Sequence, residues 1–298
     1  MLSVNLADAR RSGKSVRDEV RGANHPSPAP LRQDPATKAS VDLGLTGRAI
    51  IVSGGSSGIG LACVAALLAE GAMVATCARD HERLRHATAA FDPASCLAVP
   101  ADVTDARAME AFVATTVERF GRLDGVAAIA GQGIHGRALD LSIAQWESEV
   151  MGKLRGVLNL VAPARPHLRR SDGPRIVTLS APTARDPDPG MAASSAGRAA
   201  LANLSRALAL DLAGEGISVN AVAVGLIDTP RQHRRHDDVA PNIPYDDWLR
   251  GEADERAVPM RRPGSVADVA LLVTLALSPA LGYTTGSVLD ATGGLPGS

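Results

Sequence analysis

Three glycines near residue 55 have the spacing of a loop that can hold the phosphates of a ligand. Gly54, Gly58 and Gly60 lie in the segment Ser-Gly-Gly-Ser-Ser-Gly-Ile-Gly at 53–60. The apolar run at 50–52 is typical of a buried strand, and the Ala/Leu-rich segment at 61–70 is typical of a helix. Glycine lets the backbone approach a ligand closely, and the first N–H groups of a helix can bind a pyrophosphate. The spacing differs from the commonest dinucleotide pattern, and a tight turn without a ligand is the alternative, but the flanking strand and helix favour a phosphate site.

A glycine loop of this kind needs a sheet to hold its strand and its helix in place. From residue 41 onward, strand-like and helix-like segments alternate along the chain. Seven strands that alternate with helices predict a doubly wound parallel α/β sheet of the Rossmann type, with helices on both faces and right-handed crossovers. The strands are expected near 48–53, 73–77, 97–101, 124–130, 174–180, 217–223 and 286–290, and the helices near 58–70, 80–90, 105–120, 142–169, 194–213 and 265–278.

The connection at 225–262 is too long for a passive loop. It follows the carboxyl end of a strand, where open α/β sheets bind ligands, and we interpret it as a cap on the substrate side. Short helices are expected near 231–239 and 245–254, and Ser265 with Asp268 predicts a capping box that begins the last helix. Residues 1–40 are polar and rich in arginine and proline, and are predicted to be a disordered extension of a single domain at 41–298.

The composition is that of a globular protein with a substantial core. The 298 residues are 45% hydrophobic, with a mean hydropathy of +0.04 and a formal net charge of −1. No apolar run approaches the ~20 residues that span a bilayer, and the charge balance indicates neither nucleic acid nor a membrane as a partner. The three cysteines, Cys63, Cys77 and Cys96, lie in apolar segments and indicate reduced thiols in a cytoplasmic protein. His233 and His236 have only weak metal-ligand spacing, and we expect no metal.

Seven short motifs follow the glycine loop in order along residues 42–294. They are Ala-Asp-Val at 101–103, Gly-Arg-Leu-Asp at 121–124, Ala-Gly at 130–131, Ile-Val-Thr-Leu-Ser at 176–180, Val-Asn-Ala-Val at 219–222, Gly-Leu-Ile-Asp-Thr-Pro at 225–230 and Thr-Gly-Ser-Val-Leu-Asp-Ala-Thr-Gly-Gly at 285–294. With the glycine loop, these motifs resemble those of the classical short-chain dehydrogenase/reductase family. The resemblance implies a pyridine-dinucleotide cofactor and a homo-oligomer, a dimer or tetramer whose core is formed by the helices near 142–169 and 194–213.

Residues at the end of the second strand favour NADP(H) over NAD(H). The resemblance places Ala78 where the family has the acid that binds the ribose diol of NAD. Arg79 follows and could pair with a 2′-phosphate. The alternative is that Arg79 is solvated and Asp80 touches the ribose, although Asp80 is better placed to cap the next helix. By resemblance, Asp102 contacts the adenine amino group and Thr229 the carboxamide or phosphates. The full set of expected cofactor residues is Gly54, Ser56, Ser57, Gly58, Ile59, Gly60, Arg79, Asp102, Val103, Ala130, Gly131, Arg198, Gly225, Ile227 and Thr229.

The four positions that carry the family's chemistry hold other residues here. The family uses a Tyr acid/base, a Lys four residues later, a Ser that orients the substrate oxygen and an Asn that sustains a proton relay. By resemblance these positions are Ser194, Arg198, Ala181 and Lys153, with Ser180 one place before the Ser position. A serine hydroxyl titrates far above a phenol and arginine stays protonated, so this pair cannot transfer protons in the usual way at neutral pH.

The replaced residues leave two readings open. Arg198 could hold the nicotinamide ribose or a substrate oxyanion, and Lys153 would add a second cation, which suggests a pocket for a carboxylate, enolate or phenolate. In the other reading, Ser194 caps a helix while Lys153 and Arg198 pair with acids in an inactive site. We name Arg198, Ser194 and Lys153 as the candidate catalytic residues.

The other side chains that could transfer a proton near the site can be explained without a catalytic role. His135 follows the fourth strand near the expected pocket but suits a solvent-facing loop. Asp186 and Asp188 lie in a Pro/Asp turn. Tyr245, in the cap, suits an exposed helix start, and the only other tyrosine is Tyr283.

The sequence therefore predicts an NADP(H)-binding, oxidoreductase-like protein with a non-standard active site and a conjugated or anionic small-molecule substrate. A conjugated acceptor is favoured over a simple ketone, because hydride addition to it gives an enolate that cations can stabilise. A redox-neutral enzyme of the cyclase or isomerase type and a non-catalytic NADP(H)-binding subunit are the alternatives.

Overall fold

A seven-stranded parallel sheet lies at the centre of the computed structural model, which describes residues 42–295. The strand order is β3-β2-β1-β4-β5-β6-β7, so the direction of winding reverses between β1 and β4. This is the doubly wound Rossmann-type sheet that the alternation predicts, and all seven strands lie within two residues of the expected positions. They are β1 Ala49–Ser53, β2 Met73–Ala78, β3 Cys96–Pro100, β4 Gly125–Ala128, β5 Arg175–Ser180, β6 Ser218–Val224 and β7 Val288–Ala291.

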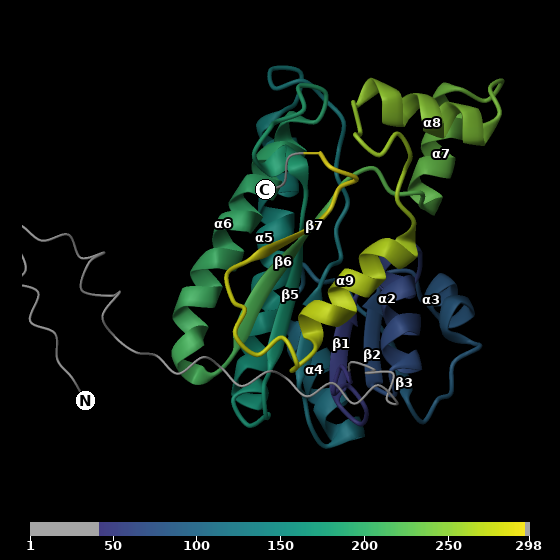
Figure 1. The fold of residues 1–298 in the computed structure, drawn as a ribbon. Helices are drawn as coiled ribbons and strands as arrows, with labels where there is room; N and C mark the ends of the chain where they lie inside the picture. The colour runs from purple at the N-terminus through teal and green to yellow at the C-terminus, as the bar shows by residue number, and fades with distance from the viewer. Residues whose placement is uncertain (1–41, 296–298) are drawn as a thin grey trace, which may run out of the picture. The chain divides into compact units, whose positions relative to one another are not determined.

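Helices cover both faces of the sheet (Figure 1). One layer of the core joins the sheet to α2 and α9, and the other joins it to α4, α5 and α6. Because both faces are covered, β1, β4 and β5 are buried along their whole length, which explains their continuous apolar runs. The helices are α2 Gly58–Ala69, α3 His81–Thr88, α4 Ala106–Phe120, α5 Ile143–Leu168, α6 Ala192–Leu212, α7 Pro230–Val239, α8 Tyr245–Glu255 and α9 Val266–Leu277.

Polar side chains begin several of these helices. Asp80 accepts a hydrogen bond from the backbone N–H of Arg83 and caps α3, as expected. Ser265 and Asp268 form the predicted capping box at α9, and Ser142 forms a second one with Gln145 at α5. These caps satisfy backbone N–H groups that have no partner within the helix.

One buried acid ties the amino ends of three strands together. Asp124, 3% exposed, precedes β4 and accepts a hydrogen bond from the backbone N–H of Ala49 at the start of β1 (2.8 Å). Arg122 donates two hydrogen bonds to it, at 2.7 and 2.8 Å, and Ser171 donates a third at 2.5 Å. The backbone N–H of Arg175, which begins β5, donates to the carbonyl of Asp124 (3.1 Å).

The connection between β6 and α9 carries the two predicted short helices, α7 and α8. They pack on a small apolar cluster of their own, formed by Leu226, Trp248, Leu249, Ala253 and Val258. Figure 1 places this pair at the end of the sheet where the strands finish. Residues 1–40, predicted to be an extension, lie outside the described residues.

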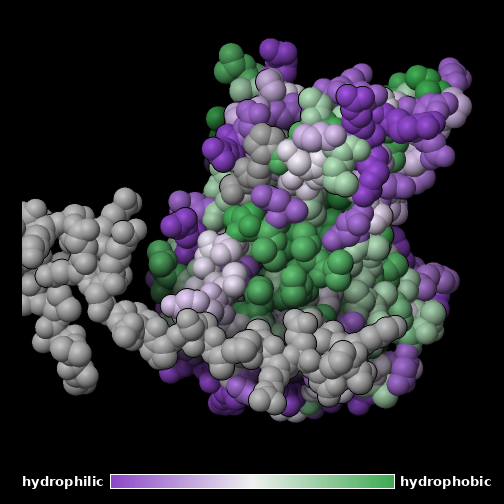
Figure 2. Space-filling view, in the orientation of Figure 1, coloured by the Kyte–Doolittle hydropathy of each residue, from purple (hydrophilic) through white to green (hydrophobic). Residues whose placement is uncertain are grey.

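Apolar side chains also gather on the outer surface. Figure 2 shows such a region where β7 and α9 lie in Figure 1. Leu271 of α9 is an exposed apolar side chain. Within residues 42–295, no helix is long and apolar enough to cross a membrane. The three cysteines are free thiols, with Cys63 and Cys77 buried and Cys96 partly buried.

Candidate functional site

The predicted cofactor residues come together at one edge of the sheet. Each group follows the carboxyl end of a parallel strand, and in a parallel sheet these ends lie side by side. The groups are 54–60 after β1, Arg79 after β2, Asp102 and Val103 after β3, Ala130 and Gly131 after β4, and Gly225, Ile227 and Thr229 after β6.

The glycine loop is shaped by two steric requirements. Gly58, the first residue of α2, has φ +56°, a conformation that favours glycine. Gly60 packs so tightly on the turn that a Cβ there would lie 2.2 Å from the carbonyl oxygen of Gly54. Ser57 precedes α2 in an extended conformation, and its side chain makes no capping hydrogen bond. The N–H groups at the start of α2 therefore have no side-chain cap and suit a pyrophosphate.

The buried hydroxyl of Ser53 bridges the switch point of the sheet beside this loop. The hydroxyl of Ser53, at the end of β1, donates to the carbonyl of Ala127 (3.3 Å). The same oxygen accepts from the N–H groups of Ile129 and Ala130, both at 3.0 Å. These bonds join the end of β1 to the end of β4 and the residues that follow it. The crevice between these two strand ends is where sheets of this type bind nucleotides.

The cap begins next to the glycine loop. A Cβ on Gly58 would lie 3.9 Å from side-chain carbons of Thr229, the N-cap residue of α7. Gly225 donates its N–H to the carbonyl of Ala291 on β7 (3.0 Å), and Ile227 forms a parallel bridge with Gly264. Thr229 is thus positioned within reach of the same ligand that the loop would hold.

Two arginines and one acid surround the far end of the loop. Arg83 of α3 donates from Nε to the hydroxyl of Ser56 (3.2 Å), while Arg79 is exposed at the end of β2. Asp102 accepts hydrogen bonds from the backbone N–H and hydroxyl of Thr104, both 2.8 Å. These bonds, with a smaller contribution from the charge of Arg79, hold the pKa of Asp102 below its ordinary value. Arg83 was not among the predicted cofactor residues.

Two of the three candidate catalytic residues, Ser194 and Lys153, are hydrogen-bonded to a buried acid that the sequence analysis missed. Glu149 of α5 accepts a hydrogen bond from the hydroxyl of Ser194 and another from the ammonium of Lys153. Lys153 also donates to the carbonyl of Gln132 (3.2 Å), and the backbone N–H of Ile134 donates to the Ser194 hydroxyl (3.1 Å). Ser194 is 4% exposed, and the side chains of Lys153 and Glu149 are 5% and 8% exposed.

This arrangement corrects the interpretation in which Ser194 caps a helix. Helix α6 begins at Ala192, with Met191 as its N-cap residue, and not at residue 194. Ser194 therefore lies inside the first turn, and its hydroxyl faces Glu149 instead of capping the helix. The one available signal for Glu149 was its position four residues before Lys153, which puts both on one face of a helix.

Arg198 lies apart from that hydrogen-bonded cluster. Its guanidinium donates from Nη1 to the carbonyl of Leu179 at the end of β5 (2.7 Å). No ion pair joins Arg198 to an acid within the described residues. Burial lowers the pKa of Arg198, and the charge of Glu149 opposes that effect. At the Ser position, Ala181 offers no hydroxyl, and the buried hydroxyl of Ser180 has no hydrogen-bond partner among residues 42–295.

Arg231 of the cap brings a third cation to the site. It donates from Nη2 to the carbonyl of Gly133 (2.8 Å), which joins α7 to the loop after β4. Burial lowers the pKa of His135, and the charges of Arg231, Arg235 and Arg256 lower it further. The site therefore has three cations, Lys153, Arg198 and Arg231, near one acid, Glu149.

The remaining proton-bearing groups have other partners. Tyr245 donates its phenol to Asp228 (2.6 Å) and stacks on His233; burial and Asp228 raise the pKa of Tyr245. Tyr283 is fully exposed. Asp188 lies in the expected turn, where its carboxylate accepts from the N–H of Gly190 (2.8 Å). Among residues 42–295, no group of three His, Cys, Asp or Glu side chains could hold a metal ion.

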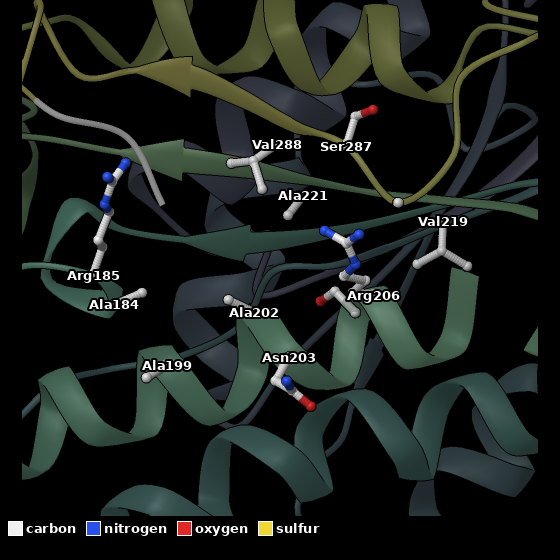
Figure 3. A pocket seen from close by; sticks show the side chains of 12 residues that line it. Ala184, Arg185, Ala199, Ala202, Asn203, Arg206, Val219, Ala221, Ser287 and Val288 are labelled. Carbon is white, nitrogen blue, oxygen red and sulfur yellow. The ribbon is translucent and has the colours of Figure 1, made fainter. Parts of the chain in front are cut away.

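A pocket of about 280 Å³ lies on another side of α6. Figure 3 shows it between α6 and the edge of the sheet at β6 and β7, with Arg185 and Arg206 among the side chains that line it. None of the candidate catalytic residues lines it. We therefore do not assign this pocket to the chemistry of the site.

A family model described as enoyl-(acyl carrier protein) reductase matches residues 54–296 of the chain. Among curated proteins, the short-chain reductase protein NovJ of Streptomyces niveus is 31% identical over 249 residues, which is 83% of this chain and 93% of that protein.

Two solved structures combine similar folds with a bound dinucleotide. A short-chain oxidoreductase from Pseudomonas aeruginosa PAO1, described as containing an atypical catalytic center, has been solved without ligand and with NADPH. Its ligand-free structure is 35% identical, with a TM-score of 0.81, and the match covers 85% of this chain and 98% of that one. The L-sorbose reductase of Gluconobacter frateurii, in complex with NADPH and L-sorbose, is 26% identical, with a TM-score of 0.80 over 86% of this chain and 98% of that one.

Proposed function

The chain belongs to the short-chain dehydrogenase/reductase family, and from that premise we propose that it is an NADP(H)-dependent oxidoreductase whose non-standard site acts on a conjugated or anionic small molecule. The observation that carries the proposal is the combination of a complete nucleotide loop with a cation-rich, tyrosine-free site. Family membership alone supports an oxidoreductase; the cofactor preference and the substrate class rest on the residues of this chain.

The choice of NADP(H) is supported by the charges beside the loop. No acid stands at residue 78, Arg79 follows β2, and Arg83 bonds Ser56 of the glycine loop, which supports a role for the two arginines as partners of a 2′-phosphate on the adenosine ribose. Two relatives of known structure bind NADPH. The residues present therefore suit the phosphorylated dinucleotide.

The substrate class follows from the charge of the site. Lys153, Arg198 and Arg231 outnumber Glu149, so the site favours a group that carries or develops negative charge. When bound, NADPH supplies a hydride, and addition of a hydride to a conjugated acceptor leaves an enolate. We propose that Arg198 and Arg231 stabilise this oxyanion with their fixed, fully charged guanidinium groups.

The missing phenol argues against ordinary ketone reduction. Within the described chain, the phenol of Tyr245 is bonded to Asp228 and Tyr283 is fully exposed, so neither replaces the tyrosine of the family. An alkoxide formed from a simple ketone needs a proton donor at once, whereas an enolate is a weaker base and can persist beside the cations. The proposal therefore favours a conjugated acceptor.

We further propose that the protein is a homo-oligomer. Met151 and Leu158 on α5 and Leu210 on α6 are exposed apolar side chains on the two helices that the family resemblance places at the core of the assembly. A change of Leu158 to Glu would then shift the mass measured by light scattering toward that of one chain.

Titration with NADPH, followed by a screen for NADPH oxidation, tests the proposed function. The acceptors would include enones and unsaturated carboxylates, with saturated ketones as the matched comparison. Binding with oxidation by the conjugated acceptors supports the proposal. Turnover without NADPH oxidation would assign a redox-neutral reaction, and binding without any turnover would assign a non-catalytic subunit. Rapid reduction of saturated ketones would contradict the proposed substrate class.

A further inference from the structure

We propose that Lys153 is the proton source of this site and that Glu149 passes its proton to Ser194. The inference rests on the proposed function, because it concerns how a reduced substrate gains the proton that the family's tyrosine would provide. It assigns a role to Glu149, which lies outside the four positions that the family uses.

The three side chains already form a continuous hydrogen-bonded chain. Lys153 donates to Glu149, and Ser194 donates to the same carboxylate oxygen. Each of the three is nearly inaccessible to solvent, so a proton that moves along them is shielded from exchange with bulk water. Ser194 occupies the tyrosine position, which places the end of this chain where the family delivers its proton.

The presence of lysine instead of arginine at position 153 supports a role in proton transfer. Lys153 is the only lysine among residues 42–295; the other two in the sequence are Lys14 and Lys38. Arginine provides every other fixed cation in that part of the chain, including Arg198 and Arg231. Arginine would form a stronger ion pair with Glu149, but it does not release a proton at accessible pH. A lysine is needed here if the cation must lose a proton.

The surroundings make that proton easier to release. Burial lowers the pKa of Lys153 below its ordinary value, and the charges of Arg198 on α6 and Arg231 on α7 lower it further. The hydrogen bond and charge of Glu149 on α5 act in the opposite direction but do not cancel the effect of burial. The uncharged partner is the carbonyl of Gln132, which accepts a hydrogen bond from the ammonium.

The proton balance of the step is simple. Once the substrate oxygen carries the electron pair of an enolate, the O–H bond of Ser194 breaks and its proton joins that oxygen, directly or through one water molecule. Glu149, which is ionised in its bonds to Lys153 and Ser194, first takes a proton from the Lys153 ammonium and then gives it to the Ser194 oxygen, so that the direction of the Ser194–Glu149 hydrogen bond reverses during the step. Lys153 ends as a neutral amine, and solvent returns its proton after the product leaves. The reverse reaction runs the same transfers backwards.

The first test needs no substrate. In the full chain labelled with ¹⁵N-lysine, the Lys153 side-chain signal is the one that disappears in Lys153→Arg, because only three lysines are present. We expect this signal to titrate below the ordinary pH range of lysine, and at a still lower pH in Glu149→Gln, which removes the carboxylate but keeps its size. A Lys153 that titrates at or above the ordinary range would overturn the proposal, whether or not the protein reduces anything.

The second test separates proton release from a structural ion pair. Lys153→Arg keeps the charge and the bond to Glu149, so a purely structural role predicts normal turnover. Proton donation predicts a fall in NADPH oxidation of about 100-fold or more, with NADPH affinity retained. Arg155→Lys, the reciprocal exchange at an exposed position of α5, is the matched control and should leave the rate unchanged. A Lys153→Arg variant with normal turnover would overturn the relay and leave the proposed function standing.

Discussion

The hydroxyl of Ser194 donates a hydrogen bond to Glu149, although 45 residues separate the two in the sequence. The bond joins the first turn of α6 to the early part of α5. The backbone N–H of Ile134 bonds the same hydroxyl, so the loop after β4 is held to this junction as well. Helix packing thus brings an acid to the place where the family has a tyrosine.

Removal of that hydroxyl should impair turnover more than stability. In Ser194→Ala, we expect NADPH oxidation to fall about 100-fold, because the last link of the proton path is lost. The unfolding free energy should fall by about 2 kcal/mol, because the two hydrogen bonds of the Ser194 hydroxyl, to Glu149 and from the Ile134 N–H, contribute about 1 kcal/mol each. Ser195→Ala is the matched control, because the Ser195 hydroxyl accepts only from the N–H of Asp188 in the described structure (3.2 Å). Equal rates for the two variants would contradict the role of Ser194.

A charge in the glycine loop should abolish cofactor binding. In Gly58→Asp, a carboxylate would stand at the start of α2 and repel the pyrophosphate, so we expect NADPH affinity to fall at least about 100-fold. Gly47→Asp introduces the same side chain at another positive φ, +72°, with open space around it. Fluorescence titration with NADPH should therefore show normal affinity for Gly47→Asp. Normal affinity in Gly58→Asp would show that the cofactor lies elsewhere.

Arg79 and Arg83 should decide between the two dinucleotides. In the double variant Arg79→Ala/Arg83→Ala, we expect the Kd for NADPH to rise about tenfold or more, because a charged 2′-phosphate loses its partners. The Kd for NADH should change little. Arg85→Ala, on the same helix α3 but paired with Glu82, serves as the control. An equal loss of affinity for NADPH and NADH would contradict a 2′-phosphate site.

Asp124 should make the fold sensitive to acid. Burial by itself would raise the pKa of Asp124, but the bonds from Arg122, Ser171 and the Ala49 N–H outweigh it and hold the pKa below the ordinary value. The folded state therefore favours the ionised form, and this stabilisation is complete above about pH 4 and lost as the pH falls through the folded-state pKa. In Asp124→Asn, the unfolding free energy at pH 7 should be lower by about 3 kcal/mol. Denaturant titrations should show this difference shrinking below about pH 4, and a constant difference would contradict the assignment.

The order of strands and helices could be predicted from the sequence because each element is encoded by nearby residues. The buried strands β1 and β5 read as apolar runs, and Asp80 and Ser265 mark the starts of α3 and α9 through bonds to N–H groups three residues away. The glycine loop could be found in the same way, because its steric demands fall on Gly58 and Gly60 themselves. The length of the connection at 225–262 was enough to predict α7 and α8.

The chemistry of the site depended on contacts that no local pattern contains. Counting along the family motifs placed Ser194, Lys153 and Arg198 at the catalytic positions, but their partners lie on other elements. Arg198 bonds the carbonyl of Leu179 on β5, and Arg231 reaches the site from the cap. Glu149 shares a helix with Lys153, but it contacts Ser194 only because α5 packs against α6. Side-chain types and local hydrogen bonds are set by neighbours in sequence, whereas the partner of a buried polar group is set by which helices and strands the fold brings into contact.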